Sequence, residues 1–192
     1  MNTQLATRRL LLRRWRPDDR PAFRQMNADP EVMAMLGPPL APAQSDALLD
    51  HIEAQFVEHG FGLWCVDRAG ECIGFTGLSI PGFRAGLEIG WRLRSAWWGQ
   101  GYASEASRAV LACAFADPPA GLGLAEVLSF TATTNERSQR VMRAIGLERD
   151  LASDFVHPAL PSGSPLGPHV LYRLTRVQFH ANAAVGPRRA LD

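Results

Sequence analysis

Apolar residues recur along this chain with two different spacings, and each spacing predicts its own kind of element. The clearest helical pattern has apolar side chains every three or four residues, so that they share one face: Leu48, Leu49, Ile52, Phe56 and Val57. Ser45 ahead of this run is a favourable N-cap, and Gly60 behind it favours a stop. We therefore predict an amphipathic helix between these two residues.

Shorter apolar runs bounded by turn residues predict strands. We expect strands at 9–15, 62–67, 72–78, 87–93, 127–131 and 169–174. Helical spacing returns around Phe23 and Met26, and again at 31–36, 104–115 and 138–145. A stretch rich in proline, glycine and serine, 157–168, predicts a long surface loop.

The order of these elements predicts an α+β protein, in which one sheet has helices packed on both faces. Three strands joined by short turns differ from the alternating strands and helices of a doubly wound dinucleotide-binding fold, which disfavours a nicotinamide enzyme. Neither an internal repeat nor a linker divides the sequence. We expect a single domain over 1–180 and a mobile tail over 181–192.

Composition narrows the set of partners. The chain has 192 residues, 46% of them hydrophobic, and a net charge of +1, so we expect one packed core and no binding to nucleic acid or to a membrane. Because the sequence shows neither a long apolar run nor a signal-peptide segment, we expect a cytoplasmic protein. The cysteines Cys65, Cys72 and Cys113 lie in apolar patterns, which predicts buried free thiols rather than a nucleophile.

Two glycines, Gly99 and Gly101, lie where the strand at 87–93 gives way to the helix at 104–115. A helix start leaves backbone N–H groups without partners and carries partial positive charge, so glycines there let the chain curl around an anion such as a pyrophosphate. A Walker A loop would need a Lys after Gly101, and a dinucleotide fingerprint would need glycine in place of Ser104. The segment therefore predicts an anion-binding loop of another kind.

Four local patterns resemble the GCN5-related N-acetyltransferase (GNAT) superfamily, and within it the RimJ/RimL-like branch that acetylates protein N-termini. They are TRRLLLR at 7–13, LEIGW at 87–91, WGQGYASEA at 98–106, and NERS at 135–138 followed by AIGL at 144–147. One position departs from the wider superfamily, which has Gln or Arg where this chain has Trp98, although tryptophan is usual in this branch. The resemblance implies a GNAT-like mixed, mostly antiparallel central sheet.

The resemblance also implies acetyl-CoA as cosubstrate and no metal. The residues expected to hold the pyrophosphate through their N–H groups or side chains form one run: Gly99, Gln100, Gly101, Tyr102, Ala103 and Ser104. The family pairs the backbone at Leu93 and Arg94 with the pantetheine arm and points an N–H at the thioester oxygen. Asn135 is expected to contact the cofactor.

Acetyl transfer to an amine requires that the amine lose its proton, and a carboxylate beside the acceptor assists this step. Glu88 is our candidate, because it carries a charge inside an otherwise apolar strand. The alternative is a glutamate on the solvent face of an amphipathic strand. Asp154 and His157, near the long loop, are further candidates for the same role.

The leaving thiolate gains a proton, and the helix at 138–145 offers no tyrosine for that purpose. By resemblance Ser138 is the general acid. Plain capping chemistry also explains Ser138 and Asn135 at a helix start. Arg137, Arg140 and Arg143 form a basic stripe that could meet the 3′-phosphate of coenzyme A, but we favour a solvated helix face.

Two functions remain open at this point. The first is an N-acetyltransferase that moves acetyl from acetyl-CoA to a primary amine, either a protein N-terminal α-amine or a small-molecule amine, by direct attack on the thioester. The alternative is a non-catalytic acyl-CoA sensor or partner-binding module, which would retain the glycines but not need Glu88 or Ser138. A homodimer is compatible with either.

Overall fold

The computed structural model describes residues 4–185, and within them the chain forms one sheet and six α-helices. The strands are β1 (Gln4–Ala6), β2 (Leu11–Arg13), β3 (Leu63–Arg68), β4 (Glu71–Ser79), β5 (Glu88–Leu93), β6 (Glu126–Ala132), β7 (Glu148–Arg149), β8 (Phe155–Val156) and β9 (Pro168–Thr175). The helices are α1 (Arg20–Ala28), α2 (Pro30–Met33), α3 (Pro42–His59), α4 (Tyr102–Phe115), α5 (Glu136–Ala144) and α6 (Arg176–Val185).

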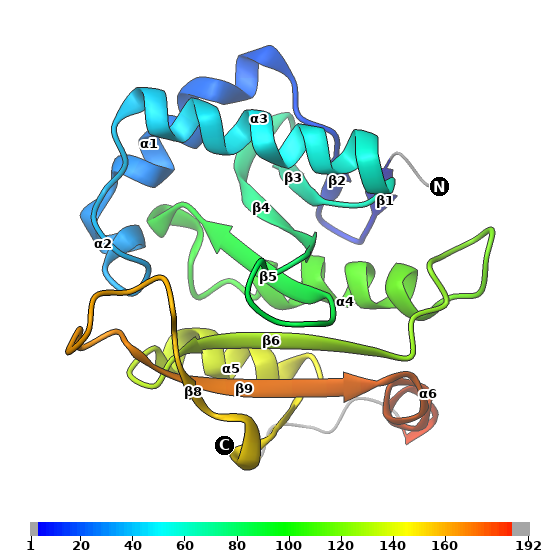
Figure 1. Cartoon of the computed structure of the whole chain (residues 1–192). Helices are drawn as coiled ribbons and strands as arrows, with labels where there is room; N and C mark the ends of the chain where they lie inside the picture. Colours follow the sequence, from blue (N-terminus) through cyan, green and yellow to red (C-terminus); the bar gives the residue numbers. More distant parts are fainter. Residues whose placement is uncertain (1–3, 186–192) are drawn as a thin grey trace.

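The sheet follows the order β1-β2-β3-β4-β5-β6-β9-β7, with β8 paired to β9 (Figure 1). Every pairing is antiparallel except that of β5 with β6, which is parallel and registers only Glu88 against Leu128. A mixed, mostly antiparallel sheet is thus confirmed. Because β5 and β6 diverge beyond that single pair, the middle of the sheet holds a gap.

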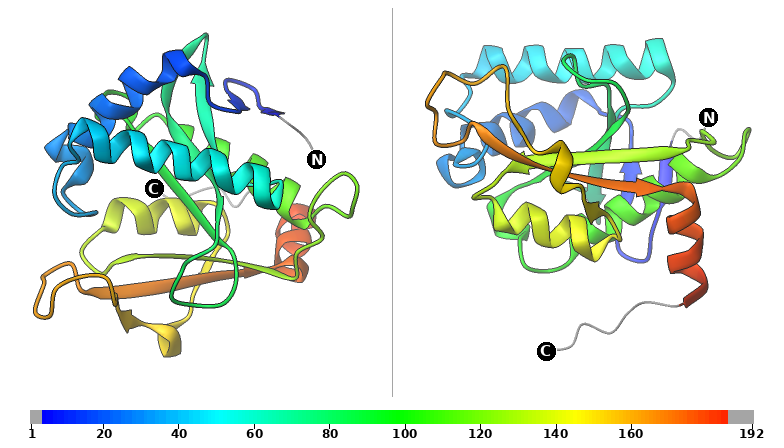
Figure 2. Two further views of the ribbon diagram at one scale, coloured as in Figure 1. Left: turned by 45° about the horizontal axis from the view of Figure 1, so that its top comes forward. Right: turned by 60° about the horizontal axis from the view of Figure 1, so that its bottom comes forward.

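Helices cover both faces of the sheet, as expected from the sequence. Figure 2 shows α1 and α3 on one side and α5 on the other, and α4 packs with α5 against β4, β5 and β6. The core between these layers is apolar, with Phe23 of α1, Ile73 of β4 and Phe115 of α4 almost fully enclosed. Within the described residues, every helix falls short of the length and hydropathy needed to cross a bilayer.

Several boundaries differ from those that the sequence predicts. Helix α3 begins at Pro42, so Ser45 lies inside it, fully buried, and its hydroxyl accepts a hydrogen bond from Asn27 instead of capping the helix. The strand expected at 9–15 is shortened to β2, Leu11–Arg13, and β1, Gln4–Ala6, is a further strand that the sequence pattern did not predict. Helix α4 begins at Tyr102, which places Ser104 in its first turn.

The expected tail needs a similar correction. Residues 181–185 are the last five of α6, a helix the sequence pattern did not predict. The rest of that tail lies outside the described residues.

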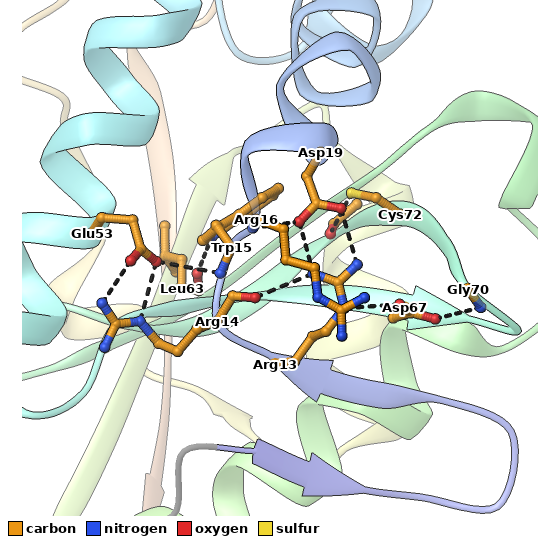
Figure 3. A network of polar contacts seen from close by, with 11 residues as sticks. Arg13, Arg14, Trp15, Arg16, Asp19, Glu53, Leu63, Asp67, Gly70 and Cys72 are labelled. Carbon is orange, nitrogen blue, oxygen red and sulfur yellow. Dashed lines mark hydrogen bonds and ion pairs between the residues drawn. The ribbon is translucent and has the colours of Figure 1, made fainter.

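A buried polar network fixes the start of α1 to the β3–β4 hairpin (Figure 3). The Arg13 guanidinium donates to both carboxylate oxygens of Asp19, at 2.7 and 2.9 Å, and to Asp67 at 2.8 Å. The thiols of Cys65 and Cys72 lie beside Asp19 with their sulfur and oxygen atoms within 4.8 Å of one another. Since the Arg13 guanidinium already occupies both oxygens of Asp19, we interpret the cluster as an ion pair that anchors α1 rather than as a cation site.

Candidate active site

The gap between β5 and β6 opens into a cavity of about 170 Å³. Its wall comes from α2 and the turn behind it, from β5 and β6, and from the first turn of α5. Glu88, Leu93, Asn135 and Ser138, which the sequence singled out separately, all line this one space. The cavity therefore brings together residues that lie up to 50 positions apart (138 − 88).

The register of β4 with β5 decides which backbone groups face the gap. Arg94 donates its N–H to the Ile73 carbonyl oxygen at 3.0 Å, on the β4 side. Antiparallel pairing alternates, so the N–H groups of Leu93 and Trp91 turn the other way, toward the gap. The Arg94 N–H, expected to face a bound ligand, is therefore engaged within the sheet, whereas that of Leu93 faces the gap.

The segment 98–104, here called the glycine loop, presents a row of backbone donors. Gly99 and Gly101 have φ values of 73° and 77°, a left-handed conformation that glycine adopts without strain. Within the described residues, the N–H groups of 99–104 have no hydrogen-bond partner, and the first helical bond of α4 is that of Glu105 to Gly101. Together with the N-terminal charge of a 14-residue helix, these groups fit an anion.

Hydrogen bonds join two of the sequence patterns, the segment 7–13 and the segment 98–106. Glu105, in the first turn of α4, accepts hydrogen bonds from the Thr7 hydroxyl at 2.7 Å and from the Arg9 backbone N–H at 2.9 Å. The Arg9 guanidinium also pairs with Glu105 at 2.6 Å and lies over the Tyr102 ring. Arg9 thus puts a cation beside the glycine loop, a role that sequence reasoning missed because its partner is 96 residues away.

Glu88 projects from β5 into the cavity and is half-buried, rather than lying on an open outer face. Burial raises the pKa of its carboxyl group to about 8, and the Ser79 hydroxyl, 3.5 Å away, lowers that pKa only in part. A carboxyl group with a pKa near neutrality is suited to accept and return a proton at physiological pH. The role predicted for Glu88 is compatible with this placement.

Asn135 and Ser138 make the capping contacts that their positions allow. The Asn135 side chain accepts from the Ser138 N–H at 3.2 Å and donates to the Thr131 hydroxyl at 2.9 Å. The Ser138 hydroxyl lines the cavity and has no partner among the described residues. Capping explains the Asn135 side chain, while the Ser138 hydroxyl stays available.

Asp154 and His157, the other candidates for the proton acceptor, lie outside the cavity. Asp154 pairs with Arg149 at 2.6 Å, and His157 sits in a cluster of aromatic rings, 4.9 Å from the His169 ring centroid. Burial lowers the pKa of His157 below its ordinary value. Neither residue lines the cavity.

The basic stripe of α5 divides into separate roles. The Arg137 guanidinium stacks over Trp98 at 3.7 Å from the ring centroid, which joins α5 to the glycine loop at the rim of the cavity. Arg143 donates to the Tyr172 hydroxyl at 3.1 Å, and Arg140 is exposed. A solvated helix face, the favoured interpretation, therefore describes Arg140 but not Arg137.

Comparisons with known proteins agree with this geometry. The family model described as "Acetyltransferase (GNAT) domain" matches residues 9–148. A protein of Aspergillus fumigatus named "FsC-acetyl coenzyme A-N(2)-transacetylase" is 32% identical over 166 residues, which cover 81% of this chain and 68% of that protein.

Solved structures are similar over nearly the whole chain. An acetyltransferase from Agrobacterium tumefaciens has a TM-score of 0.74 and 30% identity, and covers 91% of this chain and 95% of its own. RimJ of Mycobacterium smegmatis, solved with CoA-disulfide, also has a TM-score of 0.74 and covers 96% and 95%, but at 17% identity it shows the fold alone.

Proposed function

Because this chain belongs to the GNAT family and is therefore an acetyl-CoA-dependent acetyltransferase, we propose that it acetylates a primary amine that enters the cavity beside Glu88. The observation that carries the proposal is that one cavity is lined by Glu88, by the end of β5 where the Leu93 N–H faces the gap, and by Ser138. Two sources of amine fit this chemistry. One is a protein N-terminus, as in the RimJ/RimL-like branch, and the other is a small-molecule amine; the name of the fungal relative specifies an N(2)-transacetylase.

The glycine loop supplies what a pyrophosphate needs. Six N–H groups at 99–104 are free among the described residues, and a Cβ on Gly99 would meet no atom within 4 Å, so an anion has open access. Hydrogen bonds to a charged acceptor contribute about 1.5–3 kcal/mol each. Arg9, beside Gly101, adds a positive charge that favours the same ligand.

The gap between β5 and β6 supplies the rest of the donor site. The N–H groups of Leu93 and Trp91 face it, and either one donates to the thioester oxygen as that oxygen gains negative charge. The Leu93 carbonyl oxygen accepts from the Trp98 indole at 2.9 Å, which holds the glycine loop against the end of β5. In this proposal Leu93 retains its expected role and Arg94 has none at the thioester.

Glu88 accepts the proton of the incoming amine, directly or through a water molecule. A lysine-like amine is almost fully protonated at neutral pH, so removal of its proton costs about 4 kcal/mol without assistance. Ser138, at the opposite side of the cavity, donates a proton to the departing thiolate. That thiolate has a pKa of about 8.5, so the contribution of Ser138 is the smaller one.

The test is release of coenzyme A thiol from acetyl-CoA by the purified protein, with a panel of N-terminal peptides, polyamines, aminoglycosides and amino acids as acceptors. We expect thiol release that depends on the acceptor, together with an acetylated product detected by mass spectrometry. Tight binding of acetyl-CoA without turnover of any acceptor would instead indicate an acyl-CoA sensor.

A further inference from the structure

One face of β5 carries two ionisable side chains with open space between them. Side chains alternate along a strand, so Glu88, Gly90 and Arg92 point to the same face, and all three line the cavity. A Cβ built on Gly90 would meet only Glu88 Oε1, at 4.0 Å. The side chains of Glu88 and Arg92 therefore border a space that the chain itself leaves empty.

Arg92 is held in place by neutral groups. Its Nη1 donates to Asn27 Oδ1 at 2.5 Å, and the fully buried Asn27 is oriented in turn by its own hydrogen bond to Ser45 at 2.8 Å. The guanidinium lies 5.3 Å from the centroid of the Phe75 ring. Contacts from α1, α3 and β4 thus fix the guanidinium without supplying a negative charge.

The charge of Arg92 has no counterion among the described residues. Within residues 4–185 no carboxylate lies within ion-pair distance of it, and its Nε is buried without a hydrogen-bond partner. Burial lowers the pKa of Arg92 to about 10, so the side chain still carries its charge at neutral pH. A buried cation in this state is costly, and an anion that reaches it removes much of that cost.

The guanidinium keeps one donor for a ligand in the cavity. Asn27 occupies Nη1 and Nε is enclosed by protein atoms, which leaves Nη2. A charge-assisted hydrogen bond from Nη2 suits a carboxylate oxygen. Glu88 and Arg92 are four residues apart, about 13 Å between Cα atoms, and their side chains extend into the space over Gly90.

We propose that the acceptor is a small zwitterion, an amino acid or a similar compound whose amine lies at Glu88 and whose carboxylate binds Arg92. This inference rests on the proposed function and selects a small molecule over a protein N-terminus, which carries no carboxylate next to its amine. Arg92 is then a specificity-determining residue, and Gly90 gives the acceptor room.

The first experiment compares matched acceptors. Amino acids with the carboxylate one, three or five carbons from the amine are each assayed beside the corresponding amide. We expect kcat/KM to favour the carboxylate at one of these spacings, through a lower KM. Since an amide's amine loses its proton more easily, the ratio of carboxylate to amide is judged between protein variants rather than alone.

Two substitutions of Arg92 test the assignment. In Arg92→Gln the carboxylate-to-amide ratio of kcat/KM should fall about tenfold or more, because the charge-assisted hydrogen bond is lost. Arg92→Lys keeps the charge but not the planar guanidinium that Asn27 orients, and it should give an intermediate ratio. If Arg92 is only structural, both acceptors lose turnover equally and the ratio stays constant, which overturns the inference.

Asn27→Asp tests the same point with Arg92 left in place. The substitution is isosteric, Ser45 can donate to the new carboxylate, and Arg92 gains an internal counterion. We expect the carboxylate preference to fall as in Arg92→Gln, with a melting temperature equal to or above that of the wild type. A preference that survives in Asn27→Asp would contradict the role of the uncompensated charge.

The outcomes also separate this inference from the proposed function. A wild-type protein that acetylates amines, but whose carboxylate-to-amide ratio is the same in Arg92→Gln, is a transferase without the proposed specificity. A protein that releases thiol with no amine at all contradicts both.

Discussion

In the proposed function, the donor half and the acceptor half of the site are built from different parts of the chain. The donor half consists of main-chain N–H groups in the glycine loop and on β5. Substitution of the neighbouring side chains would leave these groups in place as long as Gly99 and Gly101 keep their φ values. The acceptor half consists of individual side chains on one face of β5, chiefly Glu88 and Arg92. A short sequence pattern can therefore identify the donor, whereas one substitution can change the acceptor.

The largest effect that we predict concerns the acceptor half. Glu88→Gln removes the proton acceptor and should lower kcat/KM by about 10²–10⁴-fold, with coenzyme A affinity within about twofold of the wild type. Because burial raises the pKa of Glu88 to about 8, the wild-type rate should rise with pH until that carboxyl has lost its proton. The measurement is a pH–rate profile of both proteins.

Asp154→Asn is the matched control, since it removes a carboxylate that pairs with Arg149 outside the cavity. Its pH–rate profile should follow that of the wild type. A Glu88→Gln protein that keeps the same rise of rate with pH would show that another group takes the proton.

A second prediction concerns the donor half. Gly101→Val puts a side chain at a φ of 77°, which shifts the glycine loop, and the dissociation constant for coenzyme A should rise about 10–100-fold. Calorimetry or a competition assay measures it. Gly163 has the same φ of 77° with open space around it, in the loop between β8 and β9. Gly163→Val therefore imposes equal strain, and it should leave coenzyme A affinity within twofold.

A smaller effect is expected at Ser138. Ser138→Ala should lower kcat about three- to tenfold, because the departing thiolate is a good leaving group with a pKa of about 8.5. Ser138→Thr retains the hydroxyl and should recover most of the rate. The cap from Asn135 uses the backbone N–H of residue 138, so thermal stability should not change in either variant. An equal loss of kcat in both would assign Ser138 a packing role.

The last effect is on stability rather than on rate or affinity, and it is a pH dependence of folding. A carboxyl group whose pKa is higher in the folded than in the unfolded state stabilises the fold below its unfolded pKa, and this stability is lost as the pH rises toward the folded value. Glu88 has that direction of shift, from 4.5 to about 8. Relative to the wild type, Glu88→Gln should therefore gain stability between these two pH values, on the order of 1–3 kcal/mol. Urea titrations at several pH values measure the gain, and a pH-independent difference would contradict it.

The donor half could be predicted from the sequence because its signal is local. Gly99 and Gly101 lie at a strand-to-helix junction, and their positive φ values follow from that position. The mixed sheet and the helices on both faces also followed from hydrophobic spacing and from the family resemblance. The role of Leu93 needed the register of β4 with β5, which distinguishes its N–H from that of Arg94.

The acceptor half was only partly predictable, since its signals depend on tertiary contacts. Arg92 is oriented by Asn27, which is 65 residues away in the sequence. In the sequence alone, Arg92 is one more charged residue on a strand. Ser45 looked like a helix cap for the same reason, because its partner Asn27 belongs to a different helix. Strands β7 and β8 have two residues each, too few to show an alternating pattern.

The single residue pair between β5 and β6 has a consequence for folding. Strands β1 to β5 form one hydrogen-bonded block and β6 to β9 another, and in the part of the chain that the structure describes, strand pairing joins them only at Glu88 and Leu128. Cooperative units of this kind open separately in amide hydrogen exchange. We expect two groups of amide protons with different protection factors. A ligand bound in the gap should bring the exchange rates of the two groups closer together, because it would bridge the two halves of the sheet.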